Sequence, residues 1–130
     1  MLVTTIPMNN KMSEIMNDEF KQWREHTEVL VADLIADGSN EEVFHTIEHH
    51  FASEDFDLLE QAAITAFKLG MEVEEPEEAE LEDGSKVFAF DISTEQPLDV
   101  EIIFNETKTM IELAHKCKVD YDGWGTYFEE

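Results

Sequence analysis

Apolar residues recur along the chain with two different periods, which predict alternating helices and strands. Over residues 13–37 they are spaced three and four apart, as in a helix, and Gly38 is suited to end it. Residues 1–12 contain Pro7 and lack this rhythm, so we expect a flexible N-terminal arm. Residues 43–51 have apolar positions on one side of an extended chain, which predicts the first strand.

The next segments predict a helix followed by a β-hairpin. We expect the helix to begin at an N-cap formed by Ser53 and to end at Gly70. Its apolar stripe consists of Phe56, Leu59, Ala63, Ala66 and Phe67. Asp83 and Gly84 lie between two extended segments, a strong hairpin signal, and Pro76 in the first arm is typical of an edge strand or a bulge.

A third helix is predicted after Asp99, and a short strand from Val119 completes the pattern. The apolar stripe of this helix consists of Val100, Ile103, Phe104, Thr107, Met110, Ile111, Ala114 and Cys117. We expect its charged residues to face away from the core, namely Glu101, Glu106, Lys108, Glu112 and Lys116.

The order strand–helix–strand–strand–helix–strand predicts an α+β fold, the ferredoxin-like βαββαβ sandwich. Right-handed connections would place two helices on one face of a four-stranded antiparallel sheet. The helix that precedes this unit is an addition, which would cover part of the other face or an edge. We therefore predict a single α+β domain over residues 13–130.

The charge balance restricts the classes of partner. The chain has 32 acidic and 8 basic residues, a formal net charge of -24 and a pI near 4.2. Such a chain repels phosphate backbones and anionic membrane surfaces, so we expect no direct binding of nucleic acid or membrane. It attracts basic partners, although a charged surface also serves solubility alone.

The single cysteine, Cys117, excludes an internal disulfide and fits a reducing compartment. The N-terminal segment lacks the basic region of a signal peptide, and no apolar run reaches membrane-spanning length. We therefore expect a cytoplasmic protein. The chain also lacks a phosphate-binding loop, a nucleophile elbow and any calcium-loop pattern, so we predict no cofactor and no catalytic residue.

The histidines raise the alternative of a metal-dependent enzyme. On a strand, His45 and His49 point to one side, and Glu48 and His50 point to the other. A metal site would use His45 and His49 with nearby carboxylates. Because the remaining histidines have no recognisable ligand spacing, structural hydrogen bonds are the simpler interpretation, and we predict no metal site.

Two acidic segments are candidates for partner binding. Residues 72–83 hold eight carboxylates in twelve residues, and residues 120–130 interleave aromatic and acidic side chains. The first suits docking of Lys and Arg, and the second suits cation–π contacts with Arg, unless Trp124 and Phe128 instead fill the core. The candidate residues are Glu72, Glu74, Glu75, Glu77, Glu78, Glu80, Asp120, Asp122, Trp124 and Tyr127.

Several strings resemble the bacterial family called regulator of ribonuclease E activity B (RraB), over about residues 25–129. They are DGS at 37–39, TIEHH at 46–50, AFKLG at 66–70, EDG at 82–84 and VDYDGWGTYFE at 119–129. The resemblance implies a protein inhibitor that binds the endoribonuclease RNase E, which initiates much bacterial mRNA decay. It implies contact with the Arg-rich non-catalytic half of that enzyme, lower cleavage and an altered degradosome composition.

The resemblance and the charge together predict a binding regulator of RNase E that does no chemistry of its own. Two alternatives remain open at this point. One is the metal-dependent enzyme using His45 and His49. The other is a general nucleic-acid mimic that blocks basic RNA-binding sites without selectivity.

Overall fold

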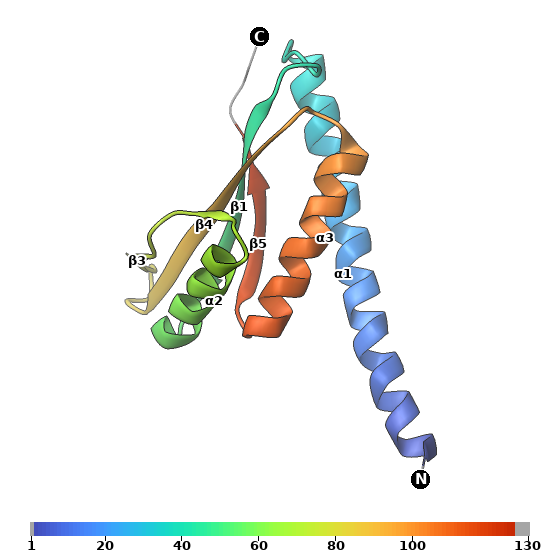
Figure 1. The fold of residues 1–130 in the computed structure, drawn as a ribbon, viewed down its shortest axis with the longest axis vertical. Coiled ribbons are helices and arrows are strands. Elements are labelled where there is room, and N and C mark those ends of the chain that lie inside the picture. The colour runs from blue at the N-terminus through green and yellow to red at the C-terminus, as the bar shows by residue number, and fades with distance from the viewer. Residues whose placement is uncertain (1, 127–130) are drawn as a thin grey trace.

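The computed structural model describes the backbone of residues 2–126 and the side chains of residues 17–126. It has the predicted α+β class, with three helices and an antiparallel sheet (Figure 1). The elements are α1 (Leu2–Ala36), β1 (His45–Ser53), α2 (Phe56–Lys68), β2 (Glu72–Val73), β3 (Glu77–Glu80), β4 (Lys86–Gln96), α3 (Val100–Cys117) and β5 (Asp120–Gly125). No helix among the described residues is long and apolar enough to cross a membrane.

The sheet has the strand order β2-β4-β1-β5, and β3 also pairs with β4. Since β1 occupies one edge of β4, β2 and β3 share the other edge and form a single interrupted strand. Pro76 lies in the interruption, as expected for a residue that cannot donate to a ladder. Gly84, with φ +87°, lies in the hairpin turn that joins β3 to β4. These findings confirm the predicted hairpin and the ferredoxin-like arrangement.

The main core lies between the sheet and the helices α2 and α3. Phe51 and Phe90 stack with ring centroids 5.0 Å apart and meet Leu59 of α2 and Ile111 of α3 in one buried cluster. Asp55, and not Ser53, caps α2, because its carboxylate accepts from the Leu58 N–H. The Ser53 hydroxyl instead accepts from the Asp55 N–H, so the helix begins two residues later than we predicted.

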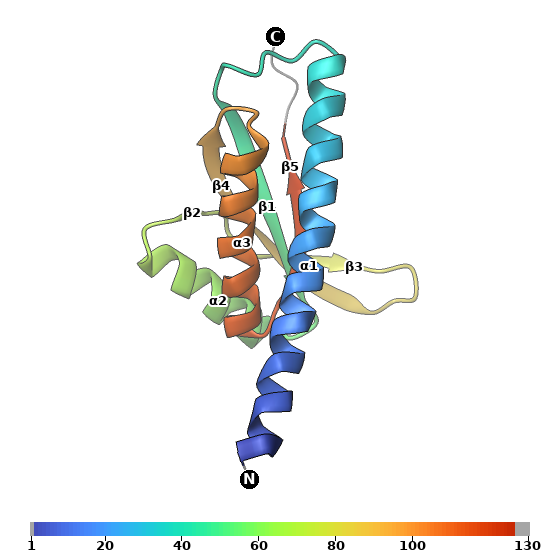
Figure 2. The same ribbon diagram turned by 90° about the vertical axis from the view of Figure 1, so that its right-hand side faces the viewer.

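The additional helix α1 runs beside α3 on the helix side of the sheet and covers the β5 edge (Figures 1 and 2). Trp23 packs edge-on against Tyr121, with centroids 5.2 Å apart. The Trp124 indole donates to the Thr27 hydroxyl at 3.0 Å, and both side chains are buried. Arg24 also pairs with Glu101 of α3. Of the two predicted positions for this helix, the structure therefore selects the edge.

Helix α1 begins at Leu2 and not at about Ser13, so residues 2–12, where we expected a flexible arm, belong to the helix. Pro7 lies only in the second turn. There, its missing N–H removes one hydrogen bond from a 35-residue helix and does not end it. The part of α1 near the N-terminus extends beyond the end of α3 (Figure 2).

Candidate functional site

One face of the sheet is covered by helices, and no described helix packs on the other, which we call the open face. Side chains along β1 point alternately to the two faces. Those on the helix side are buried, namely His45, Ile47, His49, Phe51 and Ser53, and the intervening residues, on the open face, are half-buried. This confirms the prediction that His45 and His49 share one side of the strand and Glu48 and His50 the other. The open face is therefore accessible along its strands.

The open face is acidic across the whole width of the sheet. Cross-strand pairs lie on the same face, so pairing of Glu48 with Ser93, of His50 with Asp91 and of Ala52 with both Ala89 and Asp120 defines its members. The carboxylates at these positions are Glu48, Glu72, Glu77, Asp91, Glu95 and Asp120. None of the register positions on this face is Lys or Arg. The carboxylate of Asp91 accepts a hydrogen bond from His50 Nδ1 at 2.8 Å.

The acidic strip, defined as residues 72–83, forms the free edge of this face. Glu72 and Glu77 point to the open face, and Glu78 points to the helix side, where it pairs with Lys86 at 3.5 Å. A recess of about 290 Å³ is lined by Glu74, Glu75, Glu77, Ala89, Phe90 and Asp91. The strip is thus continuous with the carboxylates of the central strands.

Glu74 shows how closely the negative charges gather. Its carboxylate lies with those of Glu48 and Asp91, with one oxygen of each within 4.8 Å of the others. Desolvation and then repulsion by Glu48 and Asp91 raise the pKa of Glu74 above its ordinary value. Exposed carboxylates commonly converge without an ion, and we assign no metal to them. Because these carboxylates repel one another, binding of a positively charged side chain beside them is favourable.

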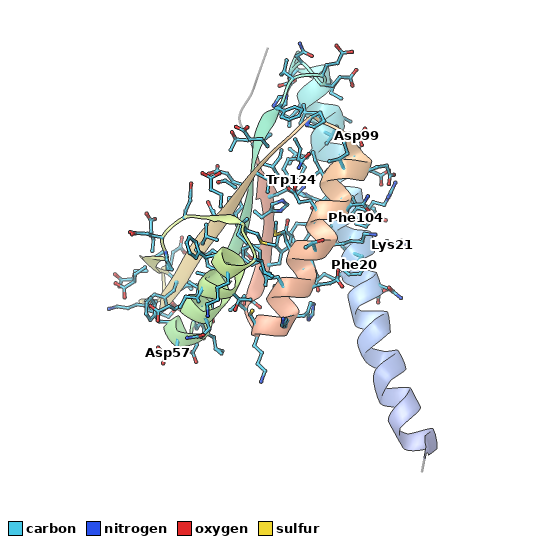
Figure 3. All side chains as sticks on the ribbon, in the orientation of Figure 1. Phe20, Lys21, Asp57, Asp99, Phe104 and Trp124 are labelled. Atoms are coloured by element: carbon cyan, nitrogen blue, oxygen red, sulfur yellow. The ribbon has the colours of Figure 1, made fainter. Side chains whose placement is uncertain are left out.

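The other sequence candidates are divided between surface and core. Asp120 and Asp122 are exposed on β5, at the opposite edge of the sheet from the acidic strip. Trp124 is only 4% exposed and lies between the sheet and the helices (Figure 3). Its side chain therefore fills the core and is not available for contact with a partner. Tyr127 and Phe128 lie outside the described residues.

The two sequence candidates for metal binding, His45 and His49, are both buried and make hydrogen bonds within the protein. The Nε2 atom of His45 lies 2.9 Å from the Asn40 carbonyl oxygen. The two ring nitrogens of His49 bind the Tyr121 hydroxyl at 2.9 Å and Glu106 at 2.6 Å. Neither histidine belongs to a group of convergent metal-binding side chains among the described residues. The geometry fits the structural interpretation.

Glu106 was expected to face solvent, and the structure corrects this. Its carboxylate accepts hydrogen bonds from His49, Thr94 and Gln96 beneath α3. Burial by itself raises the pKa of Glu106, but these bonds and the charge of His49 outweigh it and hold the pKa below its ordinary value. The sequence contained a signal for this position, because Glu106 lies three residues after Ile103 and four before Met110.

The comparisons with known proteins agree with the resemblance in the sequence. A family model described as Regulator of ribonuclease activity B matches residues 24–126. A relative with that name from Colwellia psychrerythraea is 70% identical over 116 residues, which are 89% of this chain and 100% of the relative.

Two further relatives carry the same name. The protein from Pseudoalteromonas translucida is 54% identical over 110 residues, which are 85% of this chain and 99% of the relative. The one from Aeromonas hydrophila is 51% identical over 115 residues, which are 88% of this chain and 100% of the relative. A family model that covers most of the described residues, together with relatives matched over nearly their whole length, shows that this chain belongs to the family Regulator of ribonuclease activity B.

Proposed function

We propose that this protein is a cytoplasmic, non-catalytic inhibitor of an endoribonuclease of the RNase E type. In this proposal a basic segment of the non-catalytic half of the enzyme lies across the acidic strip and the open face. Binding there lowers RNA cleavage and changes which proteins join the degradosome. The observation that carries the proposal is the open face, with carboxylates on every strand and no Lys or Arg at its register positions.

Electrostatics supports a basic protein segment over a nucleic acid as the occupant of the open face. Sheet faces that bind RNA offer aromatic side chains for stacking and cations for the phosphates. This face offers carboxylates, which repel phosphate and attract Arg and Lys. A net charge of -24 also accelerates encounter with a cationic segment, an effect that salt weakens. Inhibition then follows from occupation of the segment that would otherwise engage RNA or other proteins.

The partner-binding residues of this proposal are the carboxylates that the structure leaves exposed. They are Glu72, Glu74, Glu75, Glu77, Glu78, Glu80, Asp120 and Asp122. Glu72, Glu74 and Glu77 are its centre, because they join the strip to the carboxylates of β1 and β4. Trp124 is left out because it is buried, and Tyr127 remains a proposal from the sequence alone.

A pair of charge-matched variants tests the binding surface. One variant replaces Glu72, Glu74, Glu75 and Glu77 by glutamine. The control neutralises four exposed carboxylates outside the sheet, on α1, in the turn after it and on α3, those of Glu25, Asp33, Asp37 and Glu112. Since both lose four negative charges, only the location differs between them. Binding to the purified non-catalytic region is measured by calorimetry at 0.1 M salt.

We expect the strip variant to bind roughly ten- to a hundredfold more weakly, since each exposed ion pair contributes about 0.2–1 kcal/mol. The control should change by less than about threefold. Equal loss in both variants would show that only total charge matters, and would remove the assigned surface. If the unchanged protein fails to bind the region at low salt, the proposed function itself is wrong.

An RNA-cleavage assay tests the direction of the effect and its selectivity. The protein should slow the full-length endoribonuclease and leave a form without the non-catalytic half unaffected. It should also leave unrelated basic ribonucleases uninhibited. Inhibition of every basic protein tested would instead identify a general nucleic-acid mimic.

A further inference from the structure

An apolar groove lies next to the acidic strip, on the helix side of the same sheet edge. It is formed between α2 and the β2 edge and has a volume of about 530 Å³, within the usual range for ligand pockets. Its lining residues include Phe56, Ile64, Phe67, Val73, Glu74 and Glu75. Glu74 and Glu75 also line the recess on the open face, so the two concavities adjoin.

Large apolar side chains of α2 are exposed in the groove. Phe67 is 71% exposed, Phe56 is 41% exposed and Ile64 is 38% exposed, although all three belong to α2. We predicted that Phe56 and Phe67 would lie on the buried stripe, and the structure corrects this. The strand next to them, β2, is only two residues long. Phe56 packs edge-on against Phe88 of β4, and Phe67 is left mostly uncovered. A contiguous apolar surface of this kind is typical of an interaction site.

The charged residues at the rim of the groove restrict which molecules can bind in it. Its rim carries Glu60, Glu74 and Glu75, and Lys68 is the one cation among its lining residues. A second copy of this chain, with its net charge of -24, would be repelled from such a rim. The adjoining edge strand is interrupted at Pro76, which makes it a poor template for an added strand. The chemistry therefore fits a segment with apolar side chains on one side and Lys or Arg on the other.

We propose that the groove between α2 and β2 binds apolar side chains of the same basic segment whose cations bind the acidic strip. This inference rests on the proposed function and adds to it, because recognition then depends on an amphipathic sequence and not on positive charge alone. The apolar contact supplies selectivity, since a segment with the same charge but without apolar residues would leave the groove empty. Figure 2 shows that α2 and β2 lie away from α1, so the helix at the β5 edge does not obstruct the groove.

Two exposed phenylalanines provide a matched test. Phe67→Ala removes a ring from the groove, and Phe44→Ala removes one that is 67% exposed in the segment between α1 and β1. Ile64→Ala is a second groove variant. Because Phe67 and Phe44 are mostly exposed, both alanine variants should keep the melting temperature of the unchanged protein. Binding to the purified non-catalytic region of the endoribonuclease is measured at 0.1 M and 1 M salt.

We expect Phe67→Ala to weaken binding about tenfold at both salt concentrations, because apolar contacts are not screened. The loss caused by neutralising the acidic strip should shrink as the Debye length falls from about 10 Å to about 3 Å. Phe44→Ala should bind as tightly as the unchanged protein. Ile64→Ala should resemble Phe67→Ala, with a smaller loss for a smaller side chain.

Three outcomes would overturn the inference. If both groove variants bind like Phe44→Ala while the strip variant loses affinity, the proposed function stands and the groove has no part in it. If Phe67→Ala instead changes the oligomeric state of the protein in the absence of the endoribonuclease, measured by sedimentation, a second copy of this chain occupies the groove. If the unchanged protein does not bind the region, the proposed function and this inference fail together.

Discussion

Replacement of Glu106 by leucine tests whether the buried hydrogen-bond network beneath α3 holds the sheet and helix together. The substitution leaves the fully buried His49 N–H and the Thr94 hydroxyl without their acceptor, while half-buried Gln96 can turn toward water. Each buried donor without a partner costs about 1–3 kcal/mol. Burial of the leucine side chain offsets about 1 kcal/mol of this.

The net loss of unfolding free energy is therefore expected to be about 3 kcal/mol at pH 7. For a domain of this size, that corresponds to a fall in melting temperature of about 10 °C. Urea unfolding followed by tryptophan fluorescence and circular dichroism measures it. Glu112→Leu is the control, because Glu112 is exposed on the same helix. A loss below about 1 kcal/mol for the Glu106 variant would refute the reasoning.

The same network predicts a dependence of stability on pH. The hydrogen bonds and the charge of His49 outweigh the effect of burial and lower the pKa of Glu106, so folding favours its charged form. Its contribution is then complete above the unfolded pKa of about 4.3 and is lost as pH falls through the folded value. The stability difference between the unchanged protein and Glu106→Gln should therefore narrow from pH 7 to pH 3. A constant difference would contradict this assignment.

Four further predictions concern two glycines with positive φ, a buried tryptophan of β5 and the overall charge. Gly123→Ala should destabilise the protein by more than about 2 kcal/mol in urea unfolding, because φ is +102° and the new Cβ would lie 2.9 Å from the Trp23 ring. Gly70→Ala, with φ +86° and no atom within 4 Å, should cost only about 1–2 kcal/mol. Trp124→Phe should lower the unfolding free energy by about 1–3 kcal/mol, since the Thr27 hydroxyl loses its donor. Finally, 1 M salt should raise the melting temperature measured by calorimetry, because it screens the repulsion of a chain with net charge -24.

The periodic elements of the fold could be predicted from the sequence because their signals are local. The alternation in β1, the Asp83-Gly84 turn and the apolar stripe of α3 each lie within one segment, and the structure contains all three elements. The position of α1 could not be predicted in this way. It depends on contacts between residues about a hundred positions apart, such as Thr27 with Trp124.

At two helical positions, the residue type predicted the wrong degree of burial. Glu106 has the spacing of a buried residue, but its charge indicated solvent, and its hydrogen-bond partners come from the strands beneath it, namely His49, Thr94 and Gln96. Phe67 has the type of a buried residue, but the sheet beside it is too narrow to cover it. In both cases the neighbouring element decides, β1 for Glu106 and the short strand β2 for Phe67.

The acidic composition indicated the sign of the partner's charge but not the face that meets it. Side chains alternate along β1, so neighbouring residues of this strand point to opposite faces. His49 lies in the core, and Glu48 and His50, on either side of it, lie on the open face. A register shift of one residue would bury Glu48 and His50 and expose His49. The buried network around His49 therefore specifies the register that presents the carboxylates, so the core and the proposed binding surface depend on one another.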